Sequence, residues 1–427
     1  MESASESIEP LLEPVNGGSS DGLASTLPAL APALRGRVRP AWVSRLAGVW
    51  VQVRFAVLVY LGTRLILVAV AFANGAVTGH PINHELTNWD GAWYQFLTLH
   101  GYPDYAYHAQ STLGFFPLYS ALVWVASRPV LLFSSSVYWS TAMAGAAISI
   151  AGGLVTTVLV QRLATGWWGR EAGRRAVLLF CLFPGSVVFF MAYAEGIMLP
   201  LVTGCILALQ RRRWVLAGIL AGLATACEPE AVIIVLVCLV SALLHVRRQG
   251  WRQKSSWRSM AAPLLSLTGI GAFAIFLWAW TGTPFANLIA QHYGWGEKTD
   301  PIAVINLFSW LFGQIHFSHF NSHPTIDLNL VMGAAGVMLL IPTLYWLFKS
   351  RRRVGVAAIV WTLGIVFLAV TSEYTPPNPR LLITAFPVVI VPAYYLGRKS
   401  FAAACLVSGV LLAVLSALTF VGPTVRP

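Results

Sequence analysis

Long apolar runs separated by short polar segments make up most of this sequence. A helix needs about 20 predominantly apolar residues to cross the hydrocarbon core of a bilayer. Because backbone polar groups in lipid must be satisfied within each segment, such runs predict helices, and we expect an all-α polytopic membrane protein. The pattern predicts eleven spans, at residues 53–74, 137–160, 176–193, 196–210, 214–228, 229–246, 260–281, 327–348, 354–371, 381–397 and 400–421.

The segments outside these runs define the expected domain organisation. Residues 1–45 are rich in Ser, Glu, Gly, Ala and Pro, and they predict a disordered cytoplasmic tail because they cannot bury a core. Residues 46–427 are expected to form a single transmembrane domain. Two large loops interrupt it on the extracytoplasmic side, at residues 75–136 and 282–326.

The first of these loops has a hydrophobic pattern of its own. Residues 91–100 predict a short amphipathic helix with Trp93, Phe96 and Leu97 on one face. Residues 115–127 form a second apolar segment that is too short to span the bilayer comfortably. We expect both segments to be interfacial helices that lie along the membrane surface.

The distribution of charge predicts the orientation in the membrane. The chain is 57% hydrophobic and only 10% charged, yet its formal net charge is +12. Most of the 28 Lys and Arg residues stand in short runs between predicted spans, and with eleven spans these runs share the side of the N-terminus. By the positive-inside rule that side is cytoplasmic. The charge excess therefore indicates topology, and we expect a multi-pass plasma-membrane protein with no nucleic-acid partner.

Acidic side chains gather on the opposite, extracytoplasmic side. Asp90 follows the first predicted span, and Glu195 stands between two later ones. Glu228 and Glu230 flank a proline between two short spans. Because charges are costly within a membrane, this face is the expected functional one. Simpler interpretations remain for each residue: Asp90 as a helix N-cap, Glu195 as a solvated turn residue, and the glutamate pair as a water-exposed turn, which we favour for that pair.

Two residues on the same side are candidates for binding phosphate. Arg380 precedes a long apolar segment, where a cation at the positive end of a helix dipole favours an anion. His292 stands among aromatic residues in the second large loop. A snorkelling arginine and an ordinary surface histidine are the alternatives. None of the histidines forms the H-E-x-x-H motif of a helix-borne zinc site, so they predict no metal.

Several motifs taken together resemble the PIG-V-like mannosyltransferases, relatives of the second mannosyltransferase of GPI-anchor synthesis. In chain order they are Asn-Trp-Asp-Gly-Ala-Trp-Tyr at 88–94, His-Gly-Tyr at 100–102, Phe-Phe-Pro-Leu-Tyr at 115–119, Ala-Tyr-Ala-Glu-Gly at 192–196, Thr-Gly-Thr-Pro-Phe at 281–285, Gln-His-Tyr-Gly-Trp-Gly at 291–296, Pro-Arg-Leu-Leu at 379–382 and Ala-Phe-Pro at 385–387. The resemblance covers roughly residues 60–400. It implies a GT-C fold, a polyprenyl-phosphate sugar donor and a catalytic carboxylate in the first extracytoplasmic loop, which is Asp90 here. Glu228 departs from the pattern, because relatives often carry a basic residue before this proline, and this puts a phosphate contact there in question.

The resemblance implies a membrane glycosyltransferase that moves mannose from polyprenyl-phosphate mannose to an extracytoplasmic glycolipid or lipoglycan, with inversion, and mannose itself rests on the resemblance alone. Because phosphate is already a good leaving group, Asp90 as the base is enough. Glu195 is expected to position the acceptor or, with Asp90, a divalent cation, and Arg380 with His292 to hold the phosphate. The aromatic residues expected to contact substrate are Trp89, Trp93, Tyr94 and Tyr193.

Two other classes of protein fit many spans around a polar face. A transporter or lipid-sugar flippase would perform no covalent chemistry. Against it, the sequence shows no inverted repeat and no acidic residue in the middle of a predicted span. A non-catalytic membrane scaffold is the third interpretation, and it predicts that Asp90 is dispensable for making any glycolipid.

Overall fold

The computed structural model describes residues 41–106, 108–317, 327–373, 375–422 and 425–427. The chain divides into two units, Met1–Val49 and Trp50–Pro427. In the first unit only residues 41–49 are described, and they begin a helix. The disorder predicted for residues 1–45 therefore falls almost entirely outside the described residues. The architecture given below is that of the second unit.

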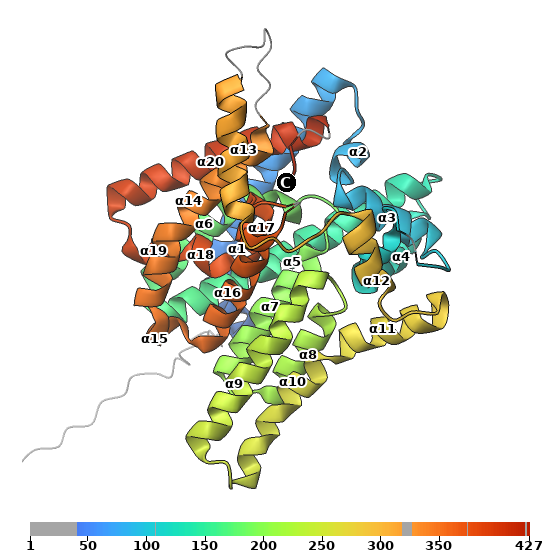
Figure 1. Ribbon diagram of the computed structural model, residues 1–427. Coiled ribbons are helices and arrows are strands. Elements are labelled where there is room, and N and C mark those ends of the chain that lie inside the picture. Colours follow the sequence, from blue (N-terminus) through green and yellow to red (C-terminus); the bar gives the residue numbers. More distant parts are fainter. Residues whose placement is uncertain (1–40, 107, 318–326, 374, 423–424) are drawn as a thin grey trace, which may run out of the picture. The chain divides into compact units, whose positions relative to one another are not determined.

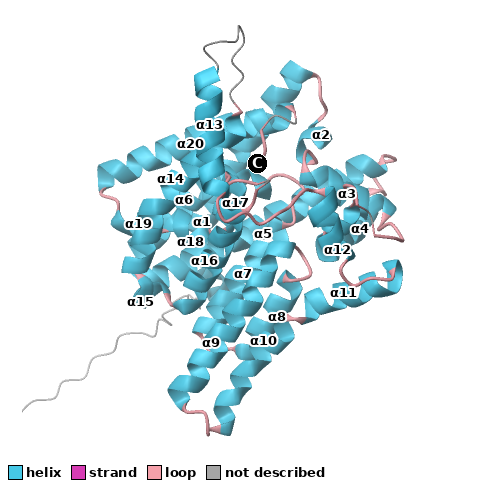
Figure 2. Cartoon of the chain, viewed as in Figure 1, coloured by secondary structure: helices cyan, strands magenta, loops and turns pink. Residues whose placement is uncertain are grey.

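The regular elements of the described residues are all helices, and Figure 2 shows them joined by loops with no strand. This confirms the all-α prediction. The α-helices are α1 (Ala41–Thr78), α2 (Ile82–Leu86), α3 (Asp90–His100), α4 (Pro117–Val130), α5 (Val137–Trp168), α6 (Arg170–Leu182), α7 (Glu195–Gln210), α8 (Trp214–Ala224), α9 (Ile233–Gln249), α10 (Ala261–Ser266), α11 (Thr268–Thr281), α12 (Ala286–Ile289), α13 (Ala303–Phe317), α14 (Leu328–Lys349), α15 (Arg351–Val354), α16 (Val356–Thr371), α17 (Pro379–Thr384), α18 (Phe386–Ile390), α19 (Pro392–Tyr395) and α20 (Arg398–Val421).

Apolar helices long enough to cross a bilayer make this a multi-pass membrane protein. Among the described residues they are Trp50–Thr78, Val137–Trp168, Pro229–Gln249, Lys254–Thr281, Leu328–Lys349 and Arg398–Val421. Shorter apolar helices accompany them, at Glu195–Gln210, Trp214–Ala224, Ala303–Gln314, Val356–Thr371 and Phe386–Tyr395. The predicted number of eleven spans is not confirmed.

Two predicted spans are broken helices. The run 176–193 contains the end of α6 and then a 3₁₀ turn, Pro184–Phe189. The run 381–397 is divided among α17, α18 and α19. Prolines explain the breaks, because proline has no amide hydrogen and disfavours helical geometry at the residue before it.

The two large loops contain more structure than a loop. The predicted helices of the first loop are present as α3 and α4, and their place along the membrane surface stays a prediction. In the second, the 15-residue helix α13 was not expected. It is shorter than the roughly 20 residues that identify a span, so the sequence pattern did not single it out.

Close packing of α5 against α7 fixes the start of α7 (Figure 1). A Cβ atom at Gly152 of α5 would lie 1.6 Å from the backbone oxygen of Gly196, so only glycine allows the two helices to approach this closely. Ser149, one turn earlier in α5, donates from Oγ to the backbone oxygen of Tyr193 at 2.8 Å. The helix pair thereby positions the segment that ends at Glu195.

Candidate active site

Arg380 joins three carboxylates at the centre of the candidate site. Its Nη1 donates a hydrogen bond to Oδ2 of Asp90, and its Nε donates to Oε1 of Glu195. Its Nη2 lies 3.6 Å from Oε1 of Glu228. Each nitrogen of the guanidinium therefore faces a different carboxylate. These four residues are called the Arg380 cluster below.

Four segments that are distant in the sequence bring the cluster together. Asp90 is the first residue of α3, Glu195 is the first residue of α7, and Arg380 is the second residue of α17. Glu228 lies in the turn between α8 and the 3₁₀ turn Pro229–Val232. The turn that follows α6 packs against the start of α17, where a Cβ at Gly185 would lie 2.1 Å from the oxygen of Pro379.

Tyrosines hold the cluster in place. The ring of Tyr193 lies under Arg380, with the guanidinium carbon 5.0 Å from the ring centroid. Its hydroxyl accepts a hydrogen bond from the backbone amide of Asp90 at 3.2 Å. The hydroxyl of Tyr94 donates to Oε1 of Glu228 at 3.5 Å. Both residues were predicted as substrate contacts, and in this structure they contact the charged residues.

The cluster is mostly buried, which determines its electrostatics. Glu195 is 1% exposed and Glu228 is 2% exposed. Burial, and then the neighbouring Glu195, raises the pKa of Glu228 well above its usual range. Burial alone would lower the pKa of Arg380, but Glu195, Asp90 and Glu228 raise it well above its ordinary value. The arginine is therefore a permanent cation.

A cavity of about 400 Å³ opens beside the cluster. Asp90 lines it, and only one of its carboxylate oxygens is bonded to Arg380; the other has no hydrogen bond within the described residues. The remaining walls combine aromatic and charged side chains. The lining includes the side chains of Trp89, Tyr94, Tyr193, Glu228, Trp295, Lys298, Arg380 and Arg426.

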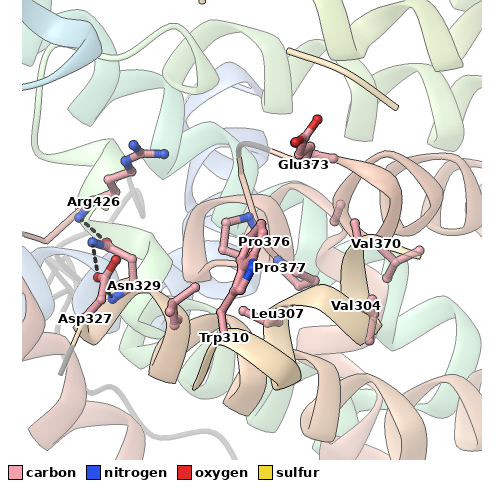
Figure 3. Close-up of a pocket in the computed structure, with 14 residues that line it drawn as sticks. Val304, Leu307, Trp310, Asp327, Asn329, Val370, Glu373, Pro376, Pro377 and Arg426 are labelled. Atoms are coloured by element: carbon pink, nitrogen blue, oxygen red, sulfur yellow. Dashed lines mark hydrogen bonds between the residues drawn. The ribbon is translucent and has the colours of Figure 1, made fainter. Parts of the chain in front are cut away.

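A smaller cavity of about 120 Å³ adjoins the first, and the two share Ser372 and Arg426 as lining residues. Figure 3 shows Leu307 and Trp310 of α13 on one side of it, with Pro376 and Pro377 beside them. At its polar end the backbone amide of Arg426 donates to Oδ1 of Asn329 at 3.0 Å.

The structure brings together most of the predicted site residues. Trp89 lines the cavity. Trp93 packs edge-on against Trp295, with ring centroids 5.0 Å apart, and does not line the cavity itself. His292 is not brought to the cluster: it is exposed, with its ring against Tyr293, and it lies outside the cavity lining.

Several simpler interpretations are wrong. Asp90 does not cap a helix, because the N-cap of α3 is Trp89 and no side chain caps that end. Glu195 is not a solvated turn residue, and Glu228 is not in a water-exposed turn, since both side chains are buried against Arg380. Arg380 does not snorkel to the membrane interface, because its guanidinium is held by three carboxylates.

Three charged residues, Glu228, Lys298 and Arg426, are among the cavity-lining residues that sequence reasoning missed. Glu228 was expected in water, although its place between two short apolar segments was a signal that it is buried. Lys298 and Arg426 are basic residues outside the cytoplasmic runs, and that rarity was visible in the sequence. They join Arg380 as cations that face the cavity.

The arrangement does not fit the divalent cation considered from the sequence. Its two candidate ligands were Asp90 and Glu195, and an oxygen of each already accepts a hydrogen bond from Arg380. Within the described part of the chain, no group of three or more His, Cys, Asp or Glu side chains is arranged to hold a metal ion. As the residues stand, a guanidinium occupies the place between the carboxylates.

Comparisons with known proteins show a likeness of fold alone. No family model matches the chain, and no curated protein does. Among solved structures, the apo oligosaccharyltransferase of Archaeoglobus fulgidus superposes with a TM-score of 0.53 at 16% identity, covering 87% of this chain and 56% of that one. The same enzyme in complex with zinc and sulfate gives 0.50 at 17% identity, covering 86% and 54%.

A third structure, ArnT from Cupriavidus metallidurans bound to undecaprenyl phosphate, gives a TM-score of 0.48 at 15% identity, covering 84% of this chain and 69% of that one. That likeness is too distant to carry an argument. The archaeal structures support the predicted GT-C-like bundle. The chain spans little more than half the length of the archaeal oligosaccharyltransferase, so the likeness fixes the architecture and leaves activity to be argued from the site.

Proposed function

We propose that this protein is a glycosyltransferase of the PIG-V-like type that transfers mannose from polyprenyl-phosphate mannose to a glycolipid or lipoglycan. The observation that carries the proposal is the position of Asp90. It lines a cavity of about 400 Å³ in a GT-C-like fold, with one carboxylate oxygen held by Arg380 and the other without a hydrogen bond among the described residues. The cavity lies within the size range of small-molecule sites, about 300–1,000 Å³.

Asp90 would act as the general base. The acceptor hydroxyl attacks the anomeric carbon of the sugar, its proton passes to the unbonded carboxylate oxygen of Asp90, and the bond from that carbon to the phosphate oxygen breaks. The configuration at the carbon inverts. Glycosidases pair their base or nucleophile with an acid because their leaving group is an alcohol. A phosphate leaves as a stable anion, and one carboxylate is enough.

Cations in the cavity would stabilise the departing phosphate. Arg380 was the expected phosphate ligand, but its guanidinium is already engaged by the three carboxylates. Lys298 and Arg426 line the same cavity, and they are better placed than His292, which does not. We propose these two side chains as the phosphate-binding residues, with Arg380 holding Asp90 in its orientation.

The membrane orientation is part of the proposal. With the N-terminus in the cytoplasm, the basic runs between helices follow the positive-inside rule. The Arg380 cluster then opens to the extracytoplasmic side of the plasma membrane, where a polyprenyl-phosphate sugar and a lipid acceptor are both within reach of the bilayer surface.

Sugar transfer in membranes tests the proposal. Membranes containing wild-type protein, Asp90→Asn or Asp104→Asn are supplied with labelled polyprenyl-phosphate mannose at matched expression. Asp104 is an exposed residue of the same loop and serves as the control. We expect labelled product from wild type and Asp104→Asn, and a rate about 10²–10⁴-fold lower from Asp90→Asn, because general base catalysis is worth that much.

The outcomes separate the alternatives. An Asp90→Asn protein that folds and transfers sugar at the wild-type rate would exclude Asp90 as the general base. Transfer from polyprenyl-phosphate glucose, galactose or arabinose, and not from the mannose donor, would keep the mechanism and change the sugar. Movement of the lipid-linked sugar across proteoliposomes without any covalent product would favour the flippase class.

A further inference from the structure

We infer that Arg380 is the permanent cation of the Arg380 cluster and that it takes the place that a divalent metal ion would otherwise take between the three carboxylates. The cluster therefore works without a metal. The inference about catalysis rests on the proposed function. The inference about metal binding does not, because it concerns only which cation the carboxylates hold.

The geometry of the guanidinium carries the first step. Its three nitrogens point in three directions within one plane, and each meets a carboxylate from a different segment of the chain. Carboxylates that converge on a common centre from several segments are also how proteins ligate hard divalent cations, at about 2.0–2.6 Å. Here the centre is a guanidinium carbon. Arg380 already uses Oδ2 of Asp90 and Oε1 of Glu195, so these two carboxylates leave a metal ion only Oδ1 of Asp90 and Oε2 of Glu195, fewer ligands than a hard divalent cation takes.

Charge and burial carry the second step. Glu195 and Glu228 are almost completely buried, and a buried carboxylate without a partner is strongly unfavourable. A cation beside such a group favours its charged form, whereas without one the group would take up a proton instead. A covalently attached arginine supplies that cation at every metal concentration. Its charge is spread over a planar fork with several donors, which suits simultaneous contact with three carboxylates.

The backbone around Arg380 fixes its position. The side chain of Asn378 caps α17 by accepting from the amide of Leu381 at 2.9 Å. Thr384 donates to the backbone oxygen of Arg380 at 3.1 Å, and the ring of Tyr193 lies under the guanidinium. The side chain is only 19% exposed. An arginine held in this way remains between the carboxylates and keeps a metal ion out.

Manganese binding to the purified protein tests the inference without any assay of activity. Mn²⁺ is titrated by electron paramagnetic resonance into wild type, Arg380→Ala and Arg380→Ala/Glu195→Gln, with Arg128→Ala as the control. Arg128 is an exposed arginine stacked on Trp124. We expect no site-bound Mn²⁺ in wild type or Arg128→Ala, and one bound ion in Arg380→Ala. The double variant should bind at least about 10-fold more weakly.

Two results would overturn the inference. One is a wild-type protein that binds one Mn²⁺ and loses it in Glu195→Gln. The other is an Arg380→Ala protein that folds and binds none. If Arg380→Ala does not fold, the comparison of wild type with Glu195→Gln still decides, since bound Mn²⁺ that depends on Glu195 contradicts a resident guanidinium.

Chelation of metals separates this inference from the proposed function. We expect the rate of sugar transfer by wild type to stay within about twofold when EDTA is added. Transfer that stops in EDTA and returns with Mn²⁺ would confirm the transferase and contradict the resident cation. A wild-type protein that transfers no sugar from any polyprenyl-phosphate donor, and also binds no Mn²⁺, would contradict the proposed function. It would not contradict the inference that Arg380 takes the place of a metal ion.

Discussion

The backbone of Trp89 sets the direction of the neighbouring carboxylate, Asp90, which we propose as the catalytic base. Its backbone has φ 58° and ψ −125°, a conformation that a bulky residue rarely adopts. Strain of this kind stores about 1–3 kcal/mol and tends to occur at functional sites, where the surroundings enforce it. The strained residue immediately precedes Asp90, so the turn sets the direction in which α3 begins. The position of the carboxylate thus depends on a conformation that no sequence pattern predicts.

Glu85 is a buried carboxyl group outside the Arg380 cluster, and it predicts how stability depends on pH. Both of its oxygens are buried without a hydrogen-bond partner among the described residues. Burial raises its pKa from 4.5 to about 7. Between these values the unfolded chain releases the proton while the folded protein keeps it. Stability is therefore highest below about pH 4.5 with respect to this group and falls as the pH rises toward 7.

Replacing Glu85 by Gln should remove this dependence. We expect Glu85→Gln to unfold at a higher temperature than wild type at pH 8, and the difference to shrink as the pH is lowered toward 5. The measurement is thermal unfolding in detergent over this pH range. Glu171→Gln is the control, because that side chain is 80% exposed. Parallel pH profiles for wild type and Glu85→Gln would show that the buried carboxyl does not titrate in this range.

At the scale of elements, the contact between α5 and α7 connects packing to the site. Gly152 contacts Gly196, the residue directly after Glu195. A methyl group at Gly152 must push α7 away, and overpacking of this kind destabilises by about 1–3 kcal/mol. It would also move Glu195 relative to Arg380. We therefore expect Gly152→Ala to lower both the unfolding temperature and the rate of sugar transfer.

Gly166 provides the matched control for this prediction. It belongs to the same helix, and a Cβ there would meet nothing within 4 Å. Alanine in place of an unconstrained helical glycine stabilises by about 0.5–1 kcal/mol, so Gly166→Ala should unfold at or above the wild-type temperature. Thermal unfolding and sugar transfer are measured for both variants. Equal behaviour of the two would mean that the close approach of α5 and α7 is not required.

The sequence pattern predicted long helices better than broken ones. The predicted span 327–348 agrees with α14 and 400–421 agrees with α20 to within two residues at each end, because length and hydrophobicity are local properties. The breaks at Pro184 and Pro387 were visible as prolines, but an apolar run around a proline also fits a kinked span. Hydrophobic periodicity alone does not distinguish a broken helix from a kinked one.

The candidate site shows the same division between local and tertiary information. Asp90, Glu195 and Arg380 were singled out from their motifs and from their place on one side of the membrane. Their contact with one another was not predicted, because it joins segments that meet only in the folded chain. Glu228 was placed in water for the same reason: the cation that makes its burial tolerable comes from a distant part of the sequence.

For the whole molecule, charge distribution links the fold to the proposed chemistry. Basic residues form most of the short helix α15, between α14 and α16, and others stand at the end of α9 and in the turn that follows it. The Arg380 cluster is assigned to the other side by the positive-inside rule. If this orientation is correct, the cavity receives an extracytoplasmic acceptor. In the reverse orientation, the same residues would face nucleotide-sugar metabolism and cytoplasmic acceptors.

Cysteine labelling in intact cells decides between the two orientations. The native cysteines are replaced first, and single cysteines are then introduced at exposed positions as Asp104→Cys, in the first loop, and Lys254→Cys, after α9. A membrane-impermeant maleimide should label Asp104→Cys in intact cells and Lys254→Cys only after permeabilisation. The opposite pattern would place Asp90 in the cytoplasm and remove the proposed acceptor. It would not affect the inference that Arg380 takes the place of a metal ion, because the contacts of Arg380 do not depend on which side of the membrane they face.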